Sequence, residues 1–287
     1  MSVPSIVVVL AALMACVHGL AVEPQRPSRV GVVGGHDAQP KQFPHMASIQ
    51  AVVPGFWIFE SSQHICGGTL IYKRWVLTTA HCLHTVPANA KRIEVVLGTE
   101  SLSSWSSQRI GVAKTITHEK YDPSRNGGAG YFDIAMIKLA SMAVLSDSVQ
   151  LAALPMSSKA PTGSATFSGW GSTEGDRAVY PDRLQTVDLP LVLYTDCFDF
   201  ITRSDPRHVN MLVESNLCAG SLTEPGVALC SLDDGSPLVQ EDTDPKRTTV
   251  IGMASWGLQD CGSKPYPSVF IRVGSFLSWI DAVFVKH

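Results

Sequence analysis

The stretch "CSLDDGSPLVQ", from Cys230 to Gln240, holds the most distinctive chemistry of this 287-residue chain. A cysteine, two acids and a glycine precede an apolar run, which indicates a sharp loop that presents one side chain. That side chain is expected to be a nucleophile, and Asp234 stands in its place. Two further groups lie beside apolar runs: His81 follows "WVLTTA", and Asp133 begins "DIAMIKL". These three residues form the candidate site.

Short β-branched runs separated by turn residues surround these groups, and their spacing favours an all-β barrel or sandwich. The C-terminal "SFLSWIDAVFVKH" is the exception, because Phe276, Trp279, Ile280 and Val283 recur at helical spacing and Ser275 suits an N-cap. The predicted strands lie in "HMASIQAVV", "GTLIYKRWVLTTA", "RIEVVLG", "DIAMIKL", "ATFSGWG", "TTVIGMASWG" and "SVFIRV".

The first 21 residues carry no Asp, Glu, Lys or Arg, and their apolar run "IVVVLAALMAC" is too short to cross a membrane. Residues 1–21 are therefore predicted to be a secretory signal peptide, with a buried helix or an anchor as the alternative. The polar, Pro-containing stretch at 22–31 is typical of a propeptide or linker.

Composition, net charge and cysteine count narrow the classes of partner and cofactor that the chain could bind. The chain is 45% hydrophobic and 16% charged with a formal net charge of -3, which disfavours nucleic-acid and membrane partners. Of seven cysteines, Cys16 falls in the leader, and the remaining even number predicts three disulfides with 15 possible connectivities. A metal site at His81, Cys82 and His84 is disfavoured if Cys82 is disulfide-bonded, so no metal or cofactor is expected. The six cysteines are Cys66, Cys82, Cys197, Cys218, Cys230 and Cys261.

With "VVGG", "CGGTLI", "GWG" and "SWG" added to these stretches, the chain from about Val32 to its end resembles the trypsin/chymotrypsin family of serine proteases. The resemblance implies two antiparallel six-stranded β-barrels, at about 32–150 and 151–273, and a C-terminal helix at about 275–285, within one protease domain at 32–287. It also implies the disulfides Cys66–Cys82, Cys197–Cys218 and Cys230–Cys261.

The resemblance assigns roles to the candidate site. His81 would be the general base and later the general acid, and Asp133 would hold the ring in the right tautomer. The family pattern places serine where Asp234 stands, and a carboxylate is a poor nucleophile toward an amide. Leu232 replaces a glycine whose N–H helps to form the oxyanion hole, and Ser236 replaces another glycine. Rescue by Ser231 or Ser236 is disfavoured, because their side chains leave the turn in other directions.

The family's activation step and its peptide-binding positions are only partly kept. Val32 would be the new N-terminus and Asp233 its buried partner, but Gly31 precedes Val32 and the nearest basic residue is Arg29. A zymogen-like form is therefore favoured over cleavage after Gly31. No acidic residue stands at the position that forms the floor of the family's substrate-binding pocket. This implies a small apolar pocket. The peptide-binding positions implied by the family are Ala228, Ser255, Trp256, Gly257 and Ser268.

The sequence thus favours a secreted, monomeric, catalytically inactive serine protease homologue. By analogy with the family, its partners would be proteases, their substrates or their inhibitors, and it would act as a cofactor or decoy in extracellular cascades, including innate immune ones. The first alternative is an active chymotrypsin-like endopeptidase with an atypical nucleophile. The second is a storage or structural protein without a specific ligand.

Overall fold

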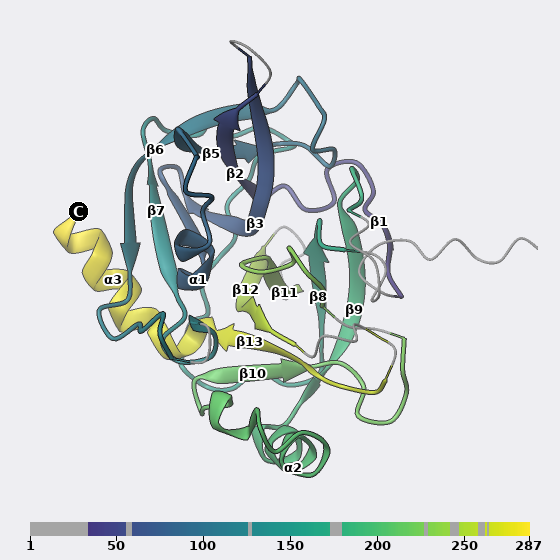
Figure 1. Ribbon diagram of the computed structural model, residues 1–287. Coiled ribbons are helices and arrows are strands. Elements are labelled where there is room, and N and C mark those ends of the chain that lie inside the picture. The colour runs from purple at the N-terminus through teal and green to yellow at the C-terminus, as the bar shows by residue number, and fades with distance from the viewer. Residues whose placement is uncertain are drawn as a thin grey trace, which may run out of the picture.

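The computed structural model describes residues 34–55, 59–125, 128–172, 180–226, 229–241, 247–257, 262 and 264–287. The predicted leader, the propeptide, Val32, Ala228 and Cys261 lie outside the described residues. Two antiparallel β-barrels and a C-terminal helix form the fold (Figure 1). The predicted fold class is therefore confirmed.

The first barrel closes from six strands in the order β2-β3-β4-β7-β6-β5, because β5 pairs back with β2. Its inward side chains are aliphatic, among them Ile49, Leu70 and Val95, which are fully buried. The strands are β2 (Met46–Pro54), β3 (Glu60–Tyr72), β4 (Trp75–Thr78), β5 (Arg92–Leu97), β6 (Gln108–Thr117) and β7 (Ala135–Leu139).

The second barrel closes through β8 and β9, in the order β9-β10-β13-β12-β11-β8. A two-residue strand, β1 (His36–Asp37), also pairs with β9. Residues within the expected span of the first barrel therefore extend the sheet of the second. The strands are β8 (Ser164–Gly169), β9 (Gln185–Val192), β10 (Asn216–Ala219), β11 (Pro237–Glu241), β12 (Thr248–Trp256) and β13 (Ser268–Arg272).

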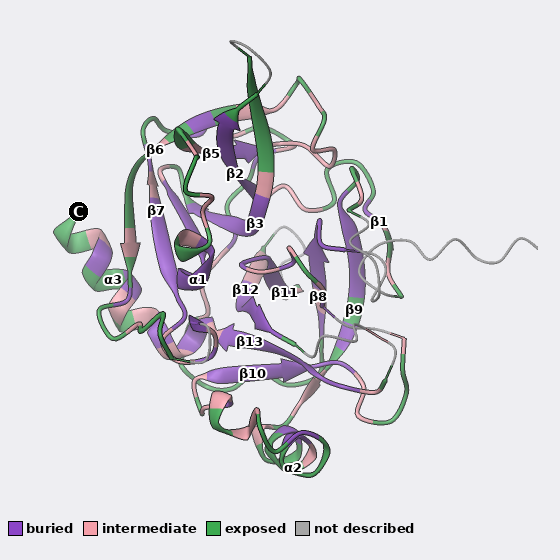
Figure 2. Ribbon diagram, in the orientation of Figure 1, coloured by how far each residue is buried: buried purple, intermediate pink, exposed green. Residues whose placement is uncertain are grey.

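The C-terminal helix α3 (Leu277–Lys286) packs on the outside of the first barrel, as Figures 1 and 2 show. Ile280 and Val283 are buried with Trp75 and Leu77. The prediction that Ser275 caps this helix is wrong. Ser275 lies in the 3-10 turn η3 (Val273–Phe276) before the helix, and its hydroxyl accepts a hydrogen bond from Arg272 Nε at 2.9 Å.

Two further helices were not predicted. The short α1 (Ala80–His84) follows β4 directly, and α2 (Tyr194–Ser204) is followed by the 3-10 turn η2 (Val209–Met211). Each helix is tied to a strand by a disulfide: Cys66–Cys82 joins α1 to β3, and Cys197–Cys218 joins α2 to β10. Both are pairs that the family resemblance implies. Closing a loop of 16 residues contributes about 3 kcal/mol in the chain-entropy model, so the first disulfide firmly fixes the start of α1.

Candidate active site

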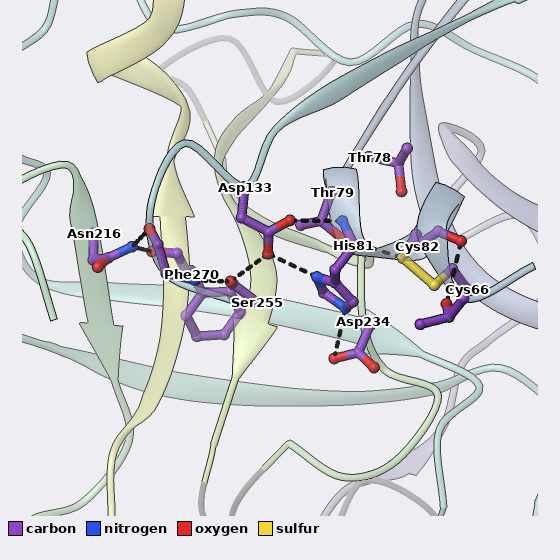
Figure 3. Close-up of polar contacts among 12 residues, drawn as sticks. Cys66, Thr78, Thr79, His81, Cys82, Asp133, Asn216, Asp234, Ser255 and Phe270 are labelled. Carbon is purple, nitrogen blue, oxygen red and sulfur yellow. Dashed lines mark hydrogen bonds and ion pairs between the residues drawn. A yellow bond between two sulfur atoms is a disulfide. The ribbon is translucent and has the colours of Figure 1, made fainter. Parts of the chain in front are cut away.

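The three candidate residues come together from both barrels (Figure 3). His81 lies on α1, Asp133 lies two residues before the start of β7, and Asp234 lies in the loop before β11. The backbone N–H of Gly67 on β3 donates to the carbonyl oxygen of Asp234 at 2.8 Å, which joins that loop to the first barrel. Residues far apart in sequence are thereby held as one site.

The carboxylate of Asp133 is fully buried and orients the imidazole of His81. Its Oδ2 lies 2.7 Å from His81 Nδ1, and its Oδ1 accepts the backbone N–H of His81 at 2.8 Å. The hydroxyl of Ser255 on β12 donates to the same Oδ2 at 2.6 Å. These three contacts satisfy the buried charge and hold the ring with Nδ1 toward Asp133.

The carboxylate of Asp234 faces the other ring nitrogen. Its Oδ1 lies 3.6 Å from His81 Nε2, and its side chain is 39% exposed, whereas that of His81 is 11% exposed. Burial by itself lowers the pKa of His81, but the charges of Asp133 and then of Asp234 outweigh it and hold this pKa well above the usual 6.5. The imidazole therefore favours its protonated form between two carboxylates.

The loop before β11 holds a strained backbone at Leu232, whose φ is +70°. Such a left-handed conformation suits glycine and costs a residue with a β-carbon about 1–2 kcal/mol. The backbone N–H groups of Leu232 and Asp234 donate no hydrogen bond within the described part of the chain.

Neither neighbouring serine is placed to act on His81. Ser236 is fully buried, and a β-carbon at Gly67 would come within 1.9 Å of its Oγ, so its hydroxyl faces β3. Ser231 is exposed, and its carbonyl oxygen accepts the N–H of Ser172 at 2.8 Å. Among the described residues, Asp234 is the one ionic or hydrogen-bonding partner of His81 Nε2.

The side chain of Asp233 is buried in the protein, and the residue is only 1% exposed. Its carboxylate accepts the N–H of Gly171 and that of Cys230, each at 2.9 Å. Burial raises the pKa of Asp233 to about 7, although the two backbone donors lower it in part. No cationic side chain in the described ranges pairs with this carboxylate.

The predicted peptide-binding positions lie along β12 and β13. Trp256 is only 7% exposed, and the ring of His208 stacks near it at 6.3 Å between centroids. Gly257 is exposed, whereas the hydroxyl of Ser268 accepts the N–H of Leu229 at 2.9 Å. Leu229 packs into the core of the second barrel. Cys230 is disulfide-bonded, and its implied partner lies outside the described residues.

Comparison with known proteins identifies the family. A family model described as Trypsin matches residues 32–280, a span that includes all three candidate residues. The chain belongs to the trypsin family. Kallikrein-7 of Homo sapiens is 33% identical over 230 residues, which cover 80% of this chain and 81% of that protein. Trypsin-1 of Astacus astacus is 32% identical over 255 residues, covering 88% and 99%.

Among solved structures, this trypsin-family chain is similar to neuropsin, a serine protease expressed in the limbic system of mouse brain. The TM-score is 0.70 at 29% identity, and the match covers 87% of this chain and 98% of neuropsin. The chymotrypsin-like fold is thus shown both by its topology and by similarity. None of the described helices is long and apolar enough to span a bilayer.

Sequence reasoning missed two contacts of this site. Ser255 was expected only at the peptide-binding edge, yet its hydroxyl also binds Asp133. His64 lies beneath the loop, with Nδ1 2.8 Å from Ser48 Oγ and Nε2 3.4 Å from the carbonyl oxygen of Leu232. Burial lowers the pKa of His64 to about 4, so this ring is neutral at physiological pH. Its position in "HICGG", two residues before Cys66, was the available signal.

Proposed function

We propose that this member of the trypsin family is a secreted, non-catalytic serine protease homologue that acts by binding other proteins. This proposal rests mainly on the 3.6 Å separation between His81 Nε2 and Asp234 Oδ1. Serine proteases place a serine hydroxyl within hydrogen-bond reach of that nitrogen, at about 3 Å. Here the nitrogen faces a carboxylate, and Asp234 takes the place of the nucleophile.

Two chemical effects support inactivity. Attack by the Asp234 carboxylate on a peptide bond would form a mixed anhydride, which is higher in energy than the amide, so the acyl step is unfavourable. The same carboxylate favours the imidazolium form of His81 and so removes the neutral base that a proton transfer needs. His81 and Asp133 are then the two retained members of a triad.

The oxyanion and activation positions support the same proposal. Leu232 carries a β-carbon at a backbone φ of +70°, where it would crowd the carbonyl group of a substrate at the oxyanion position. Asp233 keeps its carboxylate on two backbone N–H groups, as fits a zymogen-like form in which Val32 has not been released as a new N-terminus. The Cys66–Cys82 disulfide and the predicted leader support an extracellular location.

Binding is the role that this fold retains when hydrolysis is lost. The partners we propose are proteases, their protein substrates or their inhibitors, which would meet the edge at Ser255, Trp256 and Gly257 by strand addition. The chain would act as a monomer, as a cofactor or decoy in extracellular proteolysis, including that of innate immunity. Such a role needs no cofactor, nucleic acid or membrane.

Restoring the hydrolytic loop tests this proposal. The double variant Asp234→Ser with Leu232→Gly is compared with the wild type, both trimmed to begin at Val32, on a chromogenic peptide with an apolar residue before the scissile bond. We expect hydrolysis by the variant and none by the wild type above buffer. Adding His81→Ala to the double variant is the matched control and should abolish the gain. Wild-type hydrolysis that His81→Ala removes would instead support the alternative, an active endopeptidase.

A further inference from the structure

The two ring nitrogens of His81 have different environments, and this asymmetry resembles that of a metal ligand. Nδ1 faces the buried Asp133 carboxylate at 2.7 Å, which keeps the proton on Nδ1 and leaves Nε2 as the ring nitrogen whose proton a metal ion would displace. Histidines that bind zinc almost always donate their other N–H to a carboxylate or carbonyl in this way, which fixes the ring and raises its basicity.

The distance from His81 Nε2 to Asp234 Oδ1 fits two ligands of one ion. At 3.6 Å it exceeds the 2.7–3.2 Å that is usual for an N–H···O hydrogen bond. Two atoms bound at about 2.0–2.2 Å to a tetrahedral zinc ion lie about 3.3–3.5 Å apart. A shift of a few tenths of an ångström in the Asp234 side chain would therefore suffice.

We propose that His81 Nε2 and Asp234 Oδ1 together bind one Zn²⁺ ion, with water in the remaining positions. The 39% exposure of the Asp234 side chain gives an ion access from solvent and leaves space for those waters. An imidazole nitrogen paired with a carboxylate oxygen suits zinc, whereas Ca²⁺ and Mg²⁺ favour sites made of oxygen ligands alone. Asp133 orients the histidine and does not touch the ion.

Two other histidine–carboxylate pairs in the described ranges do not fit. His208 Nδ1 is hydrogen-bonded to Asp205 at 2.8 Å, too close for an ion between them. His118 Nδ1 lies 3.9 Å from Glu119 Oε2, but that nitrogen already accepts the N–H of Lys120 at 3.1 Å. The His118–Glu119 pair therefore offers a matched control of similar spacing.

The zinc site uses the same side chains as the proposed function but does not depend on it. It rests on the distance between His81 and Asp234, not on the absence of peptide hydrolysis. Zinc binding by a chain that cleaves peptides would contradict only the proposed function. Failure to bind zinc in an inactive chain would contradict only the zinc site.

Isothermal titration with ZnCl2 tests the site, at about pH 8 because a proton competes with zinc for Nε2. We expect one zinc ion per chain. Asp234→Asn keeps the shape but removes the anionic ligand, and should weaken binding at least about tenfold. Asp234→His supplies a new ligand and should keep the affinity within about tenfold of the wild type. Glu119→Gln should leave it unchanged.

Nitrogen-15 NMR of the histidine rings identifies the ligand. Zinc should shift the His81 Nε2 resonance in the wild type and leave it in place in Asp234→Asn. The proposal is overturned if the wild type shows no saturable binding up to about 1 mM zinc, which corresponds to a binding free energy of only about −4 kcal/mol. It is also overturned if Asp234→Asn binds as tightly as the wild type, or if zinc shifts another histidine instead.

Discussion

At the residue scale, the loop that carries Asp234 holds a leucine, Leu232, at a position whose backbone conformation suits glycine. Leu232 adopts a φ of +70° within a turn that ends at Gly235, whose φ is +73°. A β-carbon at Gly235 would lie 2.3 Å from Thr78 Oγ1, so only glycine fits there. The backbone conformation at position 232 also suits glycine, but leucine occupies it. The backbone is therefore strained there, and a glycine would relieve that strain.

Replacing Leu232 with glycine is therefore expected to stabilise the protein. Removing the left-handed strain should raise the free energy of unfolding by about 0.5–1 kcal/mol, after the greater chain entropy of glycine is subtracted. Urea unfolding followed by circular dichroism measures this change. Leu193→Gly is the control, because Leu193 has an ordinary φ of -59°. This substitution should lower the free energy of unfolding by about 0.5–1 kcal/mol. Equal losses in both variants would refute the strain.

A second residue-scale prediction concerns acid sensitivity at His45. Burial lowers the pKa of His45 from the usual 6.5 to about 4, and its Nε2 has no hydrogen-bond partner among the described residues. Because the folded-state pKa is depressed, the folded state disfavours protonation. The stability linked to the neutral ring is thus present above pH 6.5 and is lost as the pH falls toward 4.

The substitution His45→Phe should remove this acid dependence. Over that pH window the wild type is expected to lose about 3 kcal/mol more than the variant in urea unfolding, at about 1.4 kcal/mol per pH unit. The same substitution at the exposed His36 is the control. Parallel stability curves for the wild type and His45→Phe would show that this histidine is not linked to unfolding.

At the element scale, the C-terminal helix is held by one face. The ring of Phe284 meets those of Tyr72 and Trp75 edge-on, at centroid distances of 4.6 and 5.5 Å. The next residue, Val285, is 88% exposed. The helix thus presents adjacent side chains in opposite environments, one against the first barrel and one toward solvent.

Truncating Phe284 should loosen this helix. Phe284→Ala is expected to lower the free energy of unfolding by about 2–3 kcal/mol, somewhat less than for a fully buried ring. Val285→Ala should change it by less than about 0.5 kcal/mol. Thermal unfolding of the two variants measures this difference in stability. Similar midpoints would mean that the helix does not contribute its packing to global stability.

The helices also show what the sequence could and could not predict. The C-terminal helix was predictable because Ile280 and Val283 repeat at helical spacing and are buried on one face. Helix α2 was missed because "YTDCFDFITRS" has few strong helix formers and buries only Cys197 and Ile201. Its position depends on the disulfide to β10, a tertiary restraint that local pattern does not reveal.

At the scale of the whole molecule, motif order predicted the two barrels, and the candidate residues of the site were named from sequence alone. The contacts between barrels were not predictable, because no local pattern places Ser255 of β12 against Asp133 before β7. Nor did the sequence indicate that His36 and Asp37 would pair with β9 in the second barrel. Both depend on long-range packing that only the assembled fold defines.

Covalent labelling with a fluorophosphonate tests the central claim most directly, because the reagent reacts with an activated serine and with little else. The trimmed wild type is incubated with the probe, and intact mass with peptide mapping locates any adduct. Asp234→Ser with Leu232→Gly is the positive control. We expect labelling of the double variant at position 234 and none of the wild type. An adduct on any serine of the wild type, Ser231 and Ser236 included, would contradict the non-catalytic function.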